Sequence, residues 1–592
     1  MDGLSENENC LLTKLRIVVE KFVEHEDYKS ASFWANKVLS LSGDNRDDVY
    51  IQAKCFFHLK EYHRASHCIK VRGLHRYDLK CRHLSAKCHF IAQEYKEAFE
   101  VLDCVENEVI EKEMETDTKY TEDERKWRSA ISLLRGHIYE AMDNRGAAVE
   151  CFKEALKLNI YCYEAFHCLV QHQMLTIQEE EALISSLNFE SQCSTDESKF
   201  TKFLYETQLK KYAKPADFVI PTEYSKTIGN NVDVLTAVAE RHYYNCDYLQ
   251  CSKITSQVLV KDVYHSECLP IHLSCLMELK KTNVLFDLAH KLVELYPESP
   301  ISWYAVGCYY LMINKTDAAR RFLNKATTLD NVFGPAWLLY GHSFAVESEH
   351  DQAMAAYFKA SHLMKGCHLP LLYIGLEYGL TDNTKLAEKF FNQALVIAPD
   401  DPFVLHELGV ISYQNQDYVS AERHFNQALS LIKRKKDITS LPEKWEPLLN
   451  NMGHVLRKLR KYEEALQFHR EALVLSPQNP SSYSAIGYVY SLMCQWNTAV
   501  EYFHKALGLK REDPFSTAML GHAIDHLINE ITPIDDELPV YESQNYMLKF
   551  LSKNNLEDSL LSERANQGNE TDAEKSIDNE NTADIDMEIS GE

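Results

Sequence analysis

Two histidines and a cysteine within one short segment have side chains that bind transition metals. His63 and His67 stand four residues apart and Cys68 follows directly. On a helix, residues four apart share one face, and imidazole and thiolate are ligands that zinc prefers. A tetrahedral site needs further ligands that converge on this face, and the sequence offers none nearby. We therefore predict ordinary helix residues here and expect no metal or other cofactor.

A second candidate is His406 with Glu407, the first two residues of the His-Glu-x-x-His helix of zinc proteases. The position of the second histidine is Val410. The sequence also lacks Gly-x-Ser-x-Gly and any glycine-rich phosphate loop that follows a strand. These patterns predict that the chain is not an enzyme, and that His406 belongs to a binding groove.

The charge of the chain narrows the classes of partner. Its 592 residues carry a net charge of −25, and 17 scattered cysteines form no Cys-x-x-Cys pair. An acidic surface repels phosphate backbones and anionic lipids, so we expect no nucleic acid and no membrane as partner. The N-terminus shows no leader pattern, which predicts a reducing cytosolic or nuclear compartment. A basic run at residues 433–436 could be a nuclear address, although a solvated loop is the preferred interpretation.

Small residues recur with a period of 34, interrupted once by ten extra residues. The first small residue of each unit is glycine, at Gly307, Gly341, Gly375, Gly409, Gly453 and Gly487. Twelve residues later comes an alanine, at Ala319, Ala353, Ala387, Ala421, Ala465 and Ala499. An aromatic follows in each unit, at Phe322, Tyr357, Phe391, Phe425, Phe468 and Phe503. This pattern is typical of the tetratricopeptide repeat, a helical hairpin.

The repeat predicts an all-α superhelical solenoid. Glycine and alanine let the two helices of one hairpin approach closely, and we expect the aromatic to fill the space toward the next hairpin. We predict repeats in residues 1–176, with an acidic loop at about 106–126, then an irregular helical linker at 177–231. The second block of repeats spans 232–528 and carries an insertion at about 432–443. Residues 529–592 form an acidic tail that we expect to be disordered, and Thr532 before Pro533 is a possible phosphorylation site.

The first helix of each repeat should line a concave groove. Positions three before, one after and four after each glycine share one helix face. From the repeat of Gly341 onward this stripe mixes apolar, aromatic and hydrogen-bonding groups, as a peptide groove requires. The predicted groove residues are Leu338, His342, His406, Tyr413, Asn450, His454, Arg457 and Tyr488. The alternative is that these side chains only satisfy neighbouring helices.

Several segments exceed the general repeat pattern. ERHYYNCDY from Glu240, MKGCHLPLLYIGLEYGL from Met364 and KWEPLLNNMGHV from Lys444 resemble the subunit-six family of the anaphase-promoting complex, as do FWANKVLSLS from Phe33 and LLRGHIYEAMDNR from Leu133. The resemblance covers about residues 10–528. It implies a scaffold subunit of a ubiquitin ligase that controls mitosis, present in nucleus and cytoplasm.

The resemblance also implies partners. Members of this family form a homodimer through their N-terminal repeats and assemble with other tetratricopeptide subunits of the complex. Their second block encloses the acetylated N-terminus of a small accessory subunit.

Two alternatives remain open at this point. A chaperone adaptor would grip a C-terminal carboxylate with Asn450, Arg457 and Lys458. An enzyme would need a catalytic domain outside the repeats, and the remaining residues are too few for one.

Overall fold

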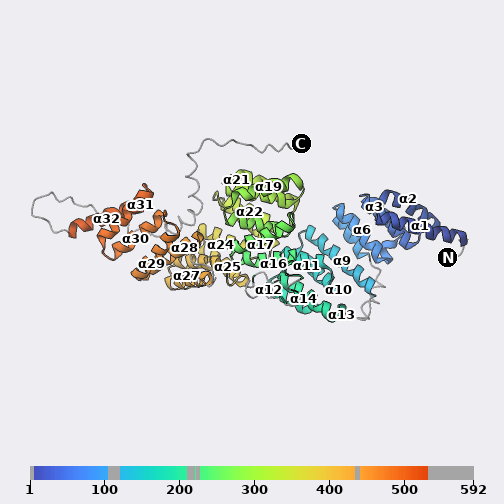
Figure 1. Cartoon of the computed structure of the whole chain (residues 1–592), viewed down its shortest axis with the longest axis horizontal. Coiled ribbons are helices and arrows are strands. Elements are labelled where there is room, and N and C mark those ends of the chain that lie inside the picture. Colours follow the sequence, from blue (N-terminus) through green and yellow to red (C-terminus); the bar gives the residue numbers. More distant parts are fainter. Residues whose placement is uncertain are drawn as a thin grey trace, which may run out of the picture.

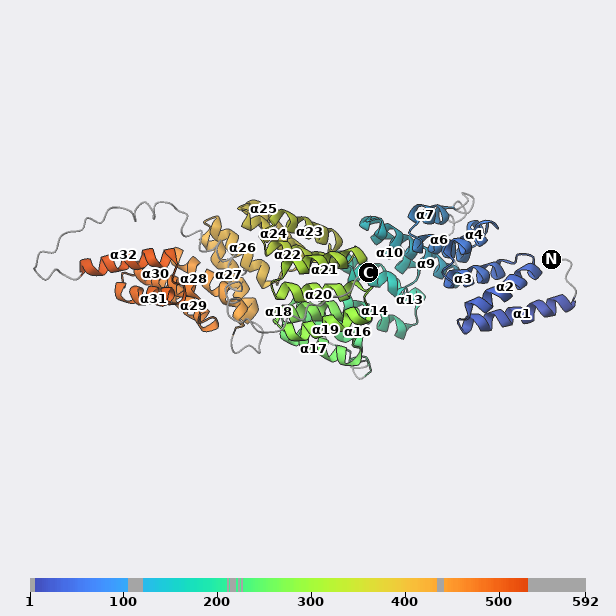
Figure 2. The same cartoon turned by 90° about the horizontal axis from the view of Figure 1, so that it is seen from above.

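The structure is a computed structural model that describes residues 6–104, 121–209, 227–433 and 441–530, together with Tyr212, Ile220, Pro221 and Tyr224. Within these ranges the chain consists of helices and contains no strand. Figures 1 and 2 show an elongated array, with α1 at one end and α32 at the other. The predicted all-α solenoid is therefore confirmed.

The first block and the segment after it form the N-terminal part of the array. Its helices are α1 (Glu6–Glu24), α2 (Tyr28–Ser42), α3 (Arg46–His58), α4 (Tyr62–Lys70), α5 (Leu74–Tyr77), α6 (Leu79–Ile91), α7 (Tyr95–Asp103), α9 (Glu122–Ala141), α10 (Arg145–Leu158), α11 (Tyr163–Gln171), α12 (Ile177–Ser186), α13 (Phe189–Gln192) and α14 (Thr195–Leu209).

The second block continues as regular hairpins. Its helices are α16 (Val232–Tyr244), α17 (Tyr248–Lys261), α18 (Cys268–Glu278), α19 (Thr282–Leu295), α20 (Pro300–Met312), α21 (Thr316–Leu329), α22 (Gly334–Ala345), α23 (His350–Leu363), α24 (Leu369–Leu380), α25 (Thr384–Ile397), α26 (Pro402–Gln414), α27 (Tyr418–Lys433), the short η2 (Glu443–Trp445), α28 (Glu446–Lys458), α29 (Tyr462–Leu475), α30 (Pro480–Leu492), α31 (Trp496–Leu509) and α32 (Pro514–Glu530).

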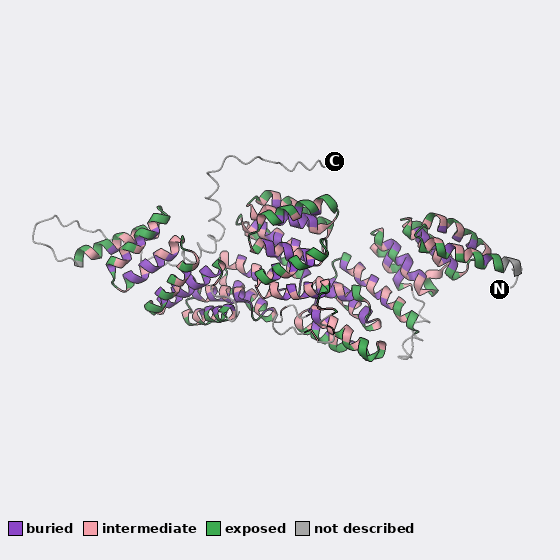
Figure 3. Ribbon diagram, viewed as in Figure 1, coloured by how far each residue is buried: buried purple, intermediate pink, exposed green. Residues whose placement is uncertain are grey.

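Burial is spread along the whole array. Figure 3 shows buried residues on nearly every helix, as expected where each hairpin packs on its neighbours. The six repeat alanines, from Ala319 to Ala499, are completely buried. A solenoid of this kind exposes a continuous inner face, and the inner face is where the first helices of the hairpins lie.

The contact made by the repeat glycines differs in part from the expectation. A Cβ added at Gly375 would lie 2.5 Å from Cε1 of Phe391, which is on the second helix of the same hairpin. The aromatic therefore closes on the glycine of its own hairpin. It also packs toward the next hairpin, as predicted, because Phe391 shares a buried cluster with Val404 and Leu408 of α26. In two repeats the residue over the glycine is not the predicted aromatic, because Leu323 faces Gly307 and His469 faces Gly453.

The turn inside each hairpin has a constant conformation. Seven residues after the small residue the backbone is left-handed, although none of these residues is glycine. They include Cys246, Lys280, Asn314, Ser348, Asp382, Gln416, Arg460 and Cys494. A left-handed residue after a helix lets the following N–H groups reach the last carbonyl oxygens of that helix. This turn fixes the angle at which the second helix returns.

Several predicted boundaries fall at the edge of the described residues. The acidic loop at about 106–126 lies mostly outside them, and α9 already begins at Glu122. α27 ends at Lys433, so the rest of the basic run and most of the insertion lie outside the described residues, as do Thr532 and the tail. The segment predicted as a helical linker contains α12, α13 and α14. Among the described helices, none has both the length and the apolar character needed to cross a membrane.

Candidate protein-binding channel

The second block contains a pocket of about 590 Å³ on its inner face, which we call the channel. Its wall is formed by α16, α18, α20, α22, α24 and α26, the first helices of successive hairpins, and by α11 of the first block. Pockets that enclose small ligands usually have volumes of about 300–1,000 Å³. The channel therefore has room for a few residues of an extended chain, and not for a folded domain.

Aromatic side chains form much of the wall. Tyr243 and Tyr244 come from α16, Tyr304 from α20 and Tyr373 from α24. Burial raises the pKa of all four phenols, so each hydroxyl keeps its proton at neutral pH. The rings offer flat apolar surface, and the hydroxyls offer hydrogen bonds to a peptide backbone.

Acidic side chains are prominent in the lining of the channel. Six carboxylates line it, namely Glu240, Glu267, Glu278, Asp330, Asp401 and Glu407. Two of them pair with histidines: Asp401 lies 2.5 Å from His368, and Glu267 lies 2.9 Å from His167. No Lys or Arg is among the described residues that line the channel. A negative, partly desolvated wall favours a ligand with positive charge.

Two of the eight predicted groove residues line this channel. Leu338 and His342 lie on α22 and face it. His342 shares a hydrogen bond of 2.7 Å with the hydroxyl of Tyr357, and burial lowers the pKa of His342 to about 4. The imidazole is therefore neutral at physiological pH and can take part in hydrogen bonds without adding charge.

The other six predicted residues are not among those that line the channel. His406 is half-buried and bonds to Glu407 at 2.8 Å and Asn451 at 3.0 Å, and only Glu407 of these reaches the channel. Tyr413 is buried and packs edge-on against Tyr418. This part of the predicted stripe lies further along the superhelix.

On α28 the predicted residues take part in a buried polar cluster. Asn450 has no exposed surface, and its amide donates to Glu446 and, at 2.5 Å, to Ser482. His469 Nδ1 donates to Asn450 Oδ1 at 2.6 Å. An amide held in this way does not present the carboxylate clamp of a chaperone adaptor.

The remaining three predicted residues lie close to this cluster. The ring of His454 packs against that of His469, with centroids 5.0 Å apart. The guanidinium of Arg457 lies 4.7 Å from the ring centre of Tyr488. Both His454 and Arg457 are buried, so in this structure they contact neighbouring helices of the chain.

The positional rule also selects channel residues in units to which the sequence prediction did not apply it. Of the twelve positions counted in the same way from Ala239, Leu273, Gly307 and Gly375, eight line the channel. They are Glu240, Tyr243, Pro270, Ser274, Met277, Tyr304, Leu372 and Leu376. Ala239 and Leu273 stand where later units have glycine, within the block predicted as repeats from residue 232.

The metal candidates of the sequence do not come together. His63 is largely exposed and lies 3.8 Å from Glu94. Among the described residues, the group with convergent ligand atoms is instead His137, Glu140 and Cys168, whose atoms lie within 4.8 Å of one another. Here Glu140 already bonds to Arg145 at 3.2 Å, and the guanidinium would repel a metal cation.

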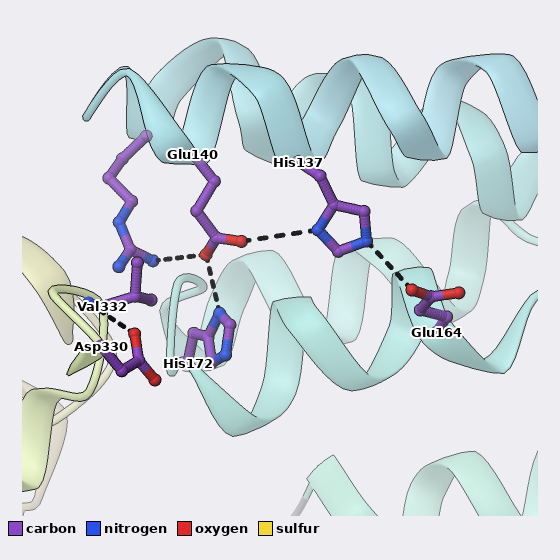
Figure 4. A network of polar contacts seen from close by, with 7 residues as sticks. His137, Glu140, Glu164, His172, Asp330 and Val332 are labelled. Carbon is purple, nitrogen blue, oxygen red and sulfur yellow. Dashed lines mark hydrogen bonds and ion pairs between the residues drawn. The ribbon is translucent and has the colours of Figure 1, made fainter. Parts of the chain in front are cut away.

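Figure 4 shows His137 and Glu140 of this group in a polar network with Glu164 and His172, and His172 also lines the channel. His137 lies 3.8 Å from Glu140 and 3.2 Å from Glu164, and His172 lies 2.7 Å from Glu140. Burial alone would lower the pKa of His137, but the two carboxylates outweigh it and raise the pKa to about 9. Burial would likewise raise the pKa of Glu140, but hydrogen bonds from His137 and His172 lower it to about 2. The network therefore carries charges at neutral pH and joins α9, α10 and α11.

Sequence models of known families match three parts of the chain. The model described as anaphase-promoting complex, cyclosome, subunit 3 matches residues 24–105. Two tetratricopeptide repeat models match residues 130–159 and 453–493. The repeat interpretation thus holds in both blocks.

Whole-chain relatives decide the family. The human cell division cycle protein 16 homolog is 52% identical, over 91% of this chain and 89% of its own. Anaphase-promoting complex subunit 6 of Arabidopsis thaliana is 38% identical, over 81% of this chain and 90% of its own. The chain belongs to the Cdc16 family of anaphase-promoting complex subunits. The fold of the Cdc16 family is also seen in the crystal structure of the APC/C hetero-tetramer Cut9-Hcn1, which is 30% identical with a TM-score of 0.74 and covers 88% of this chain and 97% of that one.

Proposed function

We propose that this chain is a scaffold subunit of the anaphase-promoting complex, the multisubunit ubiquitin ligase that drives mitotic progression and exit. In this role it contributes no catalytic group and binds other subunits through its repeats, in nucleus and cytoplasm. Membership of the Cdc16 family supports the assignment.

We further propose that the channel binds a small accessory subunit. Cut9 was crystallised together with Hcn1, and this chain has the fold of Cut9. We infer that an Hcn1-like subunit places its acetylated N-terminus between α16 and α26. Acetylation removes an ammonium group whose burial costs several kcal/mol. The carboxylates of the wall suit a partner that has Lys or Arg after its first residue.

We also propose that the chain forms a homodimer through its N-terminal repeats. Large apolar side chains are exposed there, including Phe33, Val71 and Tyr77 at 56%, 68% and 65% of their surface. Apolar patches of this kind mark protein interfaces. Docking to other tetratricopeptide subunits of the complex is part of the same proposal.

Thermal unfolding tests the small-subunit assignment. The chain is melted alone and with a saturating amount of the Hcn1-like subunit of the same species, acetylated at its N-terminus. Ligand at one hundred times its Kd stabilises a protein by about 2.7 kcal/mol, so the melting temperature should rise clearly. An unchanged melting temperature at saturation would refute the enclosed-terminus proposal. Affinity purification from mitotic cells, followed by cyclin ubiquitination with the eluate, tests membership of the ligase.

A further inference from the structure

Two segments that are far apart in the sequence meet at the rim of the channel. Gly366, in the turn between α23 and α24, donates its backbone N–H to the carbonyl oxygen of Gln173 at 2.7 Å. Gln173 follows α11 and belongs to the first block. Both blocks are therefore joined by a backbone hydrogen bond next to the channel.

The contact is close enough to require glycine. A Cβ added at Gly366 would collide with the carbonyl oxygen of Leu175 and lie 3.2 Å from that of Gln173. Both obstacles are backbone atoms, which cannot rotate away as a side chain can. Alanine at this position would therefore push the two segments apart.

Two partly buried hydroxyls add hydrogen bonds to the contact. The Gln173 amide donates to the hydroxyl of Tyr244 on α16 at 2.6 Å. The hydroxyl of Tyr212 donates to the carbonyl oxygen of Gly366 at 3.3 Å and lies 3.2 Å from Nδ1 of His368. The rings of Tyr212 and Tyr244 pack with centroids 5.0 Å apart.

Together these residues close a ring of helices. α16 and α24 are separated along the wall by α18, α20 and α22, and the contact links the end of α16 to the turn before α24. A second link between the two blocks is the ion pair of Lys359 on α23 with Asp143, 2.7 Å apart. Further along the same opening, Lys444 lies 4.1 Å from the ring centre of Tyr248, which brings η2 against α17.

We infer that Gln173, Leu175, Tyr212, Tyr244 and Gly366 form a clasp that shuts the channel from the side, so that a bound chain enters and leaves end first. The inference rests on the proposed function for its ligand. A closed ring admits a free chain end, whereas the middle of a chain can enter only after the backbone bond and the two hydroxyl bonds have broken. The clasp thereby selects a partner with an unobstructed terminus and slows its release.

The first test needs no partner. Hydrogen exchange of the Gly366 amide is measured in the free, full-length chain and in three variants. We expect protection in the wild type and in Gly508→Ala, a matched control whose added methyl group meets no atom within 4 Å. Gly366→Ala and the conservative Tyr212→Phe should exchange faster. Equal exchange in all four proteins would overturn the clasp.

The second test uses the Hcn1-like subunit of the same species in three forms: N-terminally acetylated, unacetylated, and with ubiquitin fused before its first residue. The unacetylated form controls for the acetyl group that the fusion lacks. We expect the wild type to bind both unfused forms and to reject the fusion. Gly366→Ala should accept the fusion and release the acetylated form about ten times faster, because changes at one interface act mainly on dissociation.

The outcomes separate the two proposals. If the wild type binds the fusion as tightly as the unacetylated form, end-first entry is wrong. The same conclusion follows if Gly366→Ala loses amide protection but keeps the wild-type release rate. If no form of the subunit binds the wild type, the proposed function fails and end-first entry fails with it, while the exchange measurement still shows whether the clasp is shut.

Discussion

Glu278→Gln should increase the folding stability of the free chain and lower its affinity for the small subunit. The side chain of Glu278 reaches into the channel from the end of α18, and burial raises its pKa, with the charge of Lys444 acting in the opposite direction. A carboxyl whose folded pKa lies above its unfolded value loses stability as pH rises from the ordinary value through the folded one. Ionisation of Glu278 therefore costs the fold stability, and Glu278→Gln, which cannot ionise, should raise the melting temperature of the free chain.

The same substitution removes one of the six carboxylates that line the channel and so weakens the electrostatic attraction of a positively charged partner. Two unit charges 5 Å apart interact by about 3 kcal/mol at an effective dielectric constant of 20. Water in the channel screens part of this, so we expect a loss of about 1.4 kcal/mol, or tenfold in Kd. The loss should shrink as salt is added, because salt screens charge pairs that water can reach.

Calorimetric titration with the acetylated Hcn1-like subunit, at two salt concentrations, measures the effect. Glu294→Gln is the matched control, since Glu294 is exposed on α19 and is not part of the channel wall. The reasoning is refuted if Glu278→Gln binds as the wild type does, or if the variant melts at a lower temperature.

Three further predictions concern the fold. Gly375→Ala should destabilise the chain by about 1–3 kcal/mol in urea unfolding, because the methyl group overlaps buried Phe391, whereas Gly508→Ala should be neutral or gain up to about 1 kcal/mol. The stability that His137 contributes is complete below its unfolded pKa of about 6.5 and is lost as pH rises through about 9, so melting temperatures measured from pH 6 to 9.5 should fall more for the wild type than for His137→Gln. Asn450→Ala should lower the unfolding free energy by about 2 kcal/mol, because it leaves buried partners unsatisfied; unchanged stability with weakened binding would instead support the groove role predicted from the sequence.

The repeat and the fold follow from the sequence because their signal is local. A glycine such as Gly375 and the aromatic sixteen residues later are held at a fixed distance by one hairpin, and every hairpin repeats the arrangement. Two units differ. Phe322 and Phe468 were predicted to fill this position, but the side chains that face the glycine are those of the next residues, Leu323 and His469.

The lining of the channel could be predicted only in part. Leu338 and His342 lie in it because helix periodicity identifies the inner face, and their contact with a partner stays a prediction. Periodicity does not show whether an inward polar group is satisfied by the chain itself, as Asn450 is by Ser482 and His469. The clasp left no sequence signal at all, because the bond from Gly366 to Gln173 joins backbone atoms of two blocks whose relative placement is set by the whole superhelix.

Photo-crosslinking from inside the channel tests the central claim most directly. A photoreactive phenylalanine analogue replaces Tyr304 on the channel wall or, as a control, Phe286 on α19, which is not part of the wall. The complex with the acetylated Hcn1-like subunit is irradiated and the linked peptides are identified. We expect position 304 to capture the first residues of the subunit and position 286 to capture none of them. Capture at position 286 alone, or a link from position 304 to a segment remote from the subunit's N-terminus, would contradict an enclosed chain end.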